Sequence, residues 1–123
     1  MDNQLQMDTM GSVEMLPPPL DRDVIETLRG LATPEVDIVA ELAAAFLDDG
    51  QDRLRAMNQA VIAGDEKTAR RAAHSLKGMS GSIGANHLTM LSDEFERADV
   101  LTPGGIAVLK QEFERVLSAL KAA

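Results

Sequence analysis

A histidine, a lysine and a glycine lie within five residues near the middle of the chain, in the segment His74-Ser75-Leu76-Lys77-Gly78. Residues three and four positions apart are neighbours on a helix surface, so the imidazole, the ammonium and the missing side chain of Gly78 would meet at one spot. Histidine titrates at about pH 6.5, so near neutral pH a ring nitrogen has a lone pair free for nucleophilic attack. A negatively charged group bound to His74 would therefore have a cation beside it and open space above it.

The cationic side chains of this region contrast with the rest of the chain. Arg70, Arg71 and Lys77 form a basic strip on a protein with a formal net charge of −8. An ammonium one turn from the ring could neutralise a phosphorylated imidazole. The two arginines have an equally plain interpretation as a solvated helix face with acidic partners, and that alternative stays open.

Gly78 and Gly81 both disfavour the helix that would carry the histidine. Each costs about 0.5 to 1 kcal/mol relative to alanine, so a compensating role is expected. Gly78, next to His74 on the outer face, would give clearance to an approaching partner. Gly81 and Gly84 more simply mark the end of the helix and its turn.

The composition predicts an all-α fold. The chain has three phenylalanines and no tyrosine or tryptophan, and alanine, leucine and methionine are prominent; such residues favour helix over strand. The absence of cysteine excludes disulfides, thiolate nucleophiles and cysteine-rich zinc sites. The acidic balance also argues against a nucleic-acid partner.

Capping residues and apolar spacing predict six helices. Residues 1–19, which end in three prolines, are expected to be a tail or linker, and residues 20–123 a single domain. Within it the last four helices should form an antiparallel up-and-down four-helix bundle, with one or two short N-terminal helices covering one end. The first helix is expected from Asp21 to Gly30, and the second from Thr33, as N-cap, to about Asp48. The third should follow a break at Asp49-Gly50 and end at Gly64, and the fourth should be capped by Asp65. The fifth should run from Gly84 to Ala98, and Thr102-Pro103 should open the sixth.

The apolar stripe of the fourth helix decides which way the histidine points. Ala69, Ala72, Leu76 and Met79 follow helical spacing and should face the core. His74 is then expected to face solvent.

These residues resemble the histidine-containing phosphotransfer (Hpt) domain. The resemblance rests on His74-Ser75-Leu76-Lys77-Gly78-Met79-Ser80, followed by Gly84-Ala85, Leu88, Leu91 and Phe95-Glu96, and covers about residues 65–98. The agreement in helix pattern extends it to about residues 21–122. Ser92 departs from the family pattern, which often has cysteine there.

The resemblance implies a role for each residue of the segment. His74 would accept a phosphoryl group from a receiver-domain aspartate and pass it to another receiver, Lys77 would steady the phosphate, and Gly78 would give docking clearance. Arg70, Arg71, Ser75 and Gly81 are the further candidates for partner binding. No cofactor of its own is implied, and Mg²⁺ is expected on the receiver.

Two other functions are alternatives to phosphotransfer. The phosphoacceptor domain of a histidine kinase usually has an acidic residue after the histidine and a proline one turn later, where this chain has Ser75 and Gly78, and no ATP-binding glycine boxes follow. A non-catalytic docking bundle is not distinguished by sequence. A metal site is not indicated, because His74 and His87 are the only histidines and lack ligand spacing; His87 is expected to be a surface residue near a helix start.

No apolar run approaches the roughly 18 to 20 residues that span a bilayer, and no secretory signal opens the chain. The domain is therefore expected to be cytoplasmic, without membrane contact, and monomeric, since each helix uses its apolar stripe inside one bundle. A free-standing shuttle and the C-terminal module of a hybrid sensor kinase both stay open.

Overall fold

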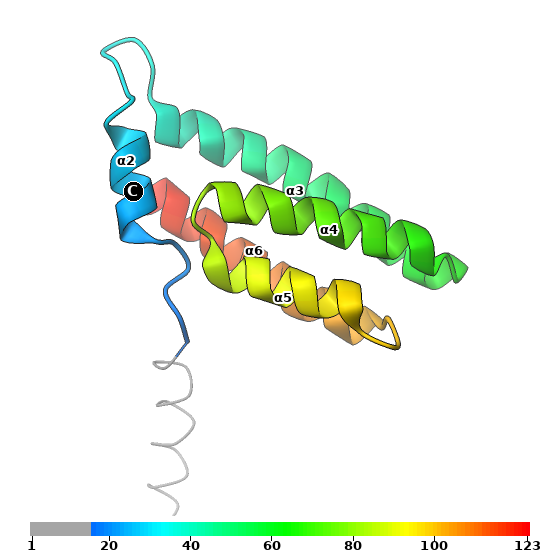
Figure 1. The fold of residues 1–123 in the computed structure, drawn as a ribbon. Coiled ribbons are helices and arrows are strands. Elements are labelled where there is room, and N and C mark those ends of the chain that lie inside the picture. Colours follow the sequence, from blue (N-terminus) through cyan, green and yellow to red (C-terminus); the bar gives the residue numbers. More distant parts are fainter. Residues whose placement is uncertain (1–15) are drawn as a thin grey trace, which may run out of the picture.

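Within residues 16–123, four long helices stand side by side and a short one crosses their end (Figure 1). The structure, a computed structural model, describes residues 16–123, so most of the predicted tail lies outside the described residues. Successive helices run antiparallel, and α4 packs on α3 and α5 while α6 closes the bundle against the same two helices. The predicted all-α bundle with one covering helix is confirmed, and the elements are α2 (Arg22–Arg29), α3 (Ile38–Ala63), α4 (Glu66–Ser82), α5 (Asn86–Arg97) and α6 (Pro103–Ala122).

Local capping explains several of the helix ends that the sequence predicts. The Asp65 carboxylate accepts a hydrogen bond from the backbone N–H of Thr68 at 3.1 Å and so caps α4. Thr102 caps α6 in the same way, with Pro103 at the first helical position. Gly64 ends α3 in the left-handed conformation, at φ 75°, which glycine adopts without steric cost.

The start of α3 differs from the prediction. Thr33 is not its N-cap: its backbone instead exchanges hydrogen bonds with that of Val36, at 3.1 and 3.2 Å. Asp37 caps the helix by accepting from the N–H of Ala40 at 3.1 Å. The prediction failed because Thr33-Pro34 satisfies the same local pattern as a true cap, and the aspartate four residues later takes the role.

The predicted break at Asp49-Gly50 is also wrong, since α3 runs through it without interruption. Gly50 is buried, and a Cβ atom at this position would overlap the ring of Phe113 on α6. That ring also packs against Phe46, with ring centroids 4.9 Å apart. The contact with α6 offsets the cost of glycine inside a helix, so the predicted second and third helices are one.

His87 is not the surface residue that its position suggested. Its side chain is only 12% exposed, because the first turn of α5 packs against α6 where Glu112 points inward. Nδ1 of His87 lies 3.3 Å from Oε1 of Glu112, whose other close partner is the guanidinium of Arg115 at 2.9 Å. A paired, buried carboxylate therefore lies beside this histidine.

None of the helices within residues 16–123 is long and apolar enough to cross a membrane. The core consists of side chains from all five helices of residues 16–123, and the contribution of α6 includes Ile106, Leu109, Phe113, Val116 and Leu120.

Two helical glycines should respond in opposite ways to the same substitution. Gly50→Ala should lower the free energy of unfolding by about 1 to 3 kcal/mol, because the new methyl group displaces the Phe113 ring. Gly78→Ala should raise it by about 0.5 to 1 kcal/mol, since nothing lies within 4 Å of the added atom. Chemical denaturation of both variants measures this. Equal stabilisation by the two alanines would contradict the packing of Gly50 against α6.

Candidate functional site

Helix α4 buries one face and exposes the opposite one. Ala69, Ala72 and Leu76 of the predicted stripe are buried and Met79 is half-buried. His74 lies on the other face, and its side chain is 66% exposed, as predicted.

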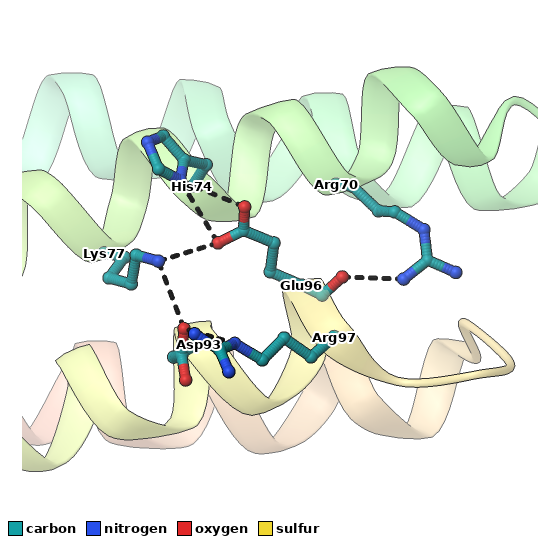
Figure 2. A network of polar contacts seen from close by, with 6 residues as sticks. All are labelled: Arg70, His74, Lys77, Asp93, Glu96 and Arg97. Atoms are coloured by element: carbon teal, nitrogen blue, oxygen red, sulfur yellow. Dashed lines mark hydrogen bonds and ion pairs between the residues drawn. The ribbon is translucent and has the colours of Figure 1, made fainter.

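A single carboxylate joins the histidine to the lysine. Glu96 of α5 reaches across to α4, where its Oε2 lies 3.0 Å and its Oε1 3.2 Å from Nδ1 of His74 (Figure 2). Lys77 donates to Oε1 of Glu96 at 2.9 Å and to Oδ1 of Asp93 at 3.1 Å. The sequence placed the imidazole and the ammonium together, and the structure adds two acidic groups between the helices.

The charges of this network support one another. The hydrogen bond from Lys77 is the main cause that lowers the pKa of Glu96, and a weaker contribution comes from the hydrogen bond with His74. Lys77 likewise lowers the pKa of Asp93. In return, hydrogen bonds to Glu96 and then to Asp93 raise the pKa of Lys77. Glu96 is therefore ionised, and Lys77 charged, throughout the neutral range.

The ionised carboxylate determines which nitrogen of a neutral His74 ring carries the proton. A carboxylate without a proton can only accept hydrogen bonds, so Nδ1 must be the donor. Nε2 then keeps its lone pair. Figure 2 shows this second nitrogen on the far side of the ring from Glu96. In this tautomer Nε2 is the ring nitrogen with a lone pair available for chemistry, on a side chain that is 66% exposed.

The two arginines predicted to bind partners differ in the structure. Arg70 donates to the backbone carbonyls of Glu96 at 2.6 Å and Ala98 at 2.8 Å, so it holds the last turn of α5 against α4 (Figure 2). It also lies 3.5 Å from the Glu66 carboxylate. Arg71 is exposed, and no hydrogen bond or ion pair involves its side chain in the part of the chain that the structure describes.

The small residues of the segment lie around the histidine. Ser75 accepts a hydrogen bond from Nε of Arg53, on α3, at 2.8 Å. Gly78 is exposed with open space above it, as expected for docking clearance. Gly81 is exposed and lies inside the last turn of α4, near Thr89, while Gly84 makes the turn that follows, at φ 76°.

Glu96 belongs to the sequence motif but has no role predicted from it, and Asp93 and Arg53 lie outside the predicted site. The signal for the acidic pair was present: Asp93 and Glu96 are three positions apart, on one face of a helix antiparallel to the one bearing Lys77. No comparable signal marks Arg53, because its contact with Ser75 joins residues 22 positions apart.

Comparison with known proteins agrees with this geometry. The family model of the Hpt domain matches residues 41–120, and the chain belongs to that family of phosphotransfer domains. The crystal structure of histidine-containing phosphotransfer protein B (HptB) from Pseudomonas aeruginosa PAO1 is similar, with a TM-score of 0.73 and 31% sequence identity, over 87% of this chain and 95% of that one. The comparison with curated proteins gives no match. The chain is thus a phosphorelay component that carries phosphoryl groups on histidine.

The Glu96 network should make stability depend on pH in the acid range. A carboxylate whose pKa is lowered by folding contributes stability above its ordinary value, 4.5 for Glu96, and loses it as the pH falls. The difference in unfolding free energy between the wild type and Glu96→Gln should therefore be largest near neutrality and shrink below about pH 4.5. Denaturant titrations from about pH 7 to about pH 3 measure it.

Glu94→Gln is the matched control for this comparison. Glu94 lies on the same helix, is exposed, and has no ion pair within residues 16–123. For Glu94→Gln, the plot of unfolding free energy against pH should run parallel to that of the wild type. If the Glu96→Gln curve is parallel as well, the lowered pKa of Glu96 is contradicted.

Proposed function

We propose that His74 is the phosphoacceptor and that Nε2 is the atom that carries the phosphoryl group. The observation that supports this most strongly is the exposed imidazole whose Nδ1 is held by the ionised Glu96. The other histidine, His87, is 12% exposed and faces Glu112, so it offers a donor no comparable approach.

The chemistry is an in-line phosphoryl transfer from an acyl phosphate. The Nε2 lone pair forms the new P–N bond while the bond from phosphorus to the receiver's aspartate oxygen breaks, and that oxygen leaves with the electron pair as carboxylate. The ring, with a proton on Nδ1 and phosphorus on Nε2, gains positive charge. Glu96 stabilises this charge through the bond to Nδ1. The reverse transfer to a second receiver uses the same atoms.

Lys77 supports this step through Glu96. By holding the carboxylate ionised and in place, it keeps the proton on Nδ1 of His74. The direct phosphate contact suggested by the resemblance stays a prediction, because Lys77 is already paired with two carboxylates.

The partners of this chemistry are receiver domains, which would approach over the open surface at Gly78. The Mg²⁺ of the receiver would supply the charge neutralisation that in-line transfer needs. Among residues 16–123 of this chain, no group of three or more His, Cys, Asp or Glu side chains could hold a metal ion. The chain would act as a carrier without a kinase core. A place in the cytoplasm, as a shuttle or as part of a hybrid kinase, fits this role.

The acceptor can be tested without knowing the partner, because potassium phosphoramidate phosphorylates exposed imidazoles. The wild type should gain one phosphoryl group, and ³¹P–¹H correlation spectra should place it on Nε2. His74→Gln should gain none and keep its helical circular dichroism, since the side chain is exposed. Glu96→Gln should react roughly threefold to tenfold more slowly, because an amide does not force the proton onto Nδ1.

His87→Gln is the control and should react like the wild type. Phosphorylation of folded His74→Gln would overturn the assignment. A receiver phosphorylated with acetyl phosphate tests the docking-only alternative. That alternative would be favoured if the receiver binds the wild-type protein without transferring its phosphoryl group, although the same protein reacts with phosphoramidate.

A further inference from the structure

The side of His74 that faces α5 contains no surplus positive charge. Lys77 and Arg97 are both bound to Asp93, at 3.1 Å each, and Lys77 also to Glu96. Arg70, on the same side, lies 3.5 Å from the Glu66 carboxylate and donates to the end of α5. Three cations therefore face three carboxylates. A phosphoryl group would bring added negative charge to a site whose cations are already neutralised.

The phosphoryl group would also point away from this network. Nε2 lies on the far side of the ring from Glu96 (Figure 2). Helices α3 and α5 lie on different sides of α4 and do not contact each other (Figure 1). The next residue, Ser75, faces α3, as its hydrogen bond with Arg53 shows. A group on Nε2 is thus displaced from the α5 carboxylates, and Arg53 approaches α4 from the opposite side.

Arg53 is an exposed cation that is held in place but not neutralised. Its Nε donates to Ser75 Oγ at 2.8 Å, which leaves the two terminal nitrogens of the guanidinium free to donate. Asp49, one turn earlier on α3, forms no ion pair with it, and neither does any other carboxylate in residues 16–123. An oriented guanidinium is well suited to an anion with several oxygens, because it can donate two parallel hydrogen bonds.

We propose that Arg53 binds the phosphoryl group carried by His74, and that Ser75 positions its guanidinium for this contact. The inference rests on the proposed role of His74 and adds to it a phosphate-binding residue on the neighbouring helix. The terminal N–H groups of Arg53 donate to the phosphoryl oxygens, while Glu96 holds the opposite side of the ring. The rival cations are Lys77, and Arg71, which lies one turn before His74 on α4. Arg70, also one turn before His74, is already bound to Glu66 and to the end of α5.

The titration of the phosphoryl group itself reports which cation contacts it. The full chain is phosphorylated with potassium phosphoramidate and the ³¹P shift of phosphohistidine is followed against pH. A contacting cation favours the dianion, so Arg53→Gln should move the midpoint up by roughly half a pH unit, with smaller shifts at high salt. Ser75→Ala, which removes the anchor and keeps the charge, should give a smaller shift in the same direction.

Arg55→Gln is the matched control. Arg55 lies on the same helix and is exposed, but it pairs with Asp52 at 3.2 Å and lines a groove between α3 and α6. Arg55→Gln removes the same charge as Arg53→Gln and should leave the midpoint of the phosphoryl titration unchanged. Circular dichroism of each variant confirms that it is folded.

Two failures can be told apart. If His74 takes up no phosphoryl group, the proposed function fails. If it does, and the midpoint of Arg53→Gln equals that of Arg55→Gln, the phosphate contact of Arg53 is overturned; a shift seen only in Lys77→Met or Arg71→Gln would assign the contact to that residue. An unchanged midpoint in Ser75→Ala would overturn the positioning role of Ser75.

Discussion

The chemistry of this domain depends on one carboxylate that two helices share. Glu96 lies between Nδ1 of His74 and Nζ of Lys77, at 3.0 and 2.9 Å. The lysine keeps the carboxylate ionised, and an ionised carboxylate must accept the histidine proton. A side chain that is 66% exposed is therefore oriented without being buried. The proposed role needs both properties, because a phosphoacceptor has to be reached by one receiver after another.

The packing of α4 makes this contact possible. Its buried face is built largely from the small residues Ala69, Ala72 and Ala73. Small side chains allow α4 to lie close to its neighbours, which brings Glu96 within reach of His74. Arg70 then fixes the last turn of α5, through the carbonyl of Glu96 itself at 2.6 Å. The α4–α5 contact is thus both a piece of the bundle core and the support of the site.

What the sequence could predict was set by local interactions. The cap at Asp65, the left-handed Gly64 and the Thr102-Pro103 start each depend on a few adjacent residues. The wrong cap at Thr33 was a local ambiguity, because Asp37 lies four residues away. The errors at Gly50 and His87 have the opposite cause, since both depend on contacts with α6. Gly50 was interpreted as a break because the ring that fills its space belongs to Phe113, on another helix. Likewise, the orientation of His74 depends on Glu96, 22 positions away. The motif contains Glu96, but no local pattern shows that its carboxylate bonds to the ring.

Long-range ¹H–¹⁵N correlation spectra of the imidazole report whether Glu96 selects the tautomer of His74. Above the pH at which the ring loses its charge, Nδ1 should carry the proton and Nε2 should be bare, the reverse of the form that free histidine prefers in water. In Glu96→Gln the two tautomers should become mixed. A wild-type His74 that carries its proton on Nε2 would show that Glu96 does not select the tautomer, because the proposed nucleophile would then have no lone pair to offer.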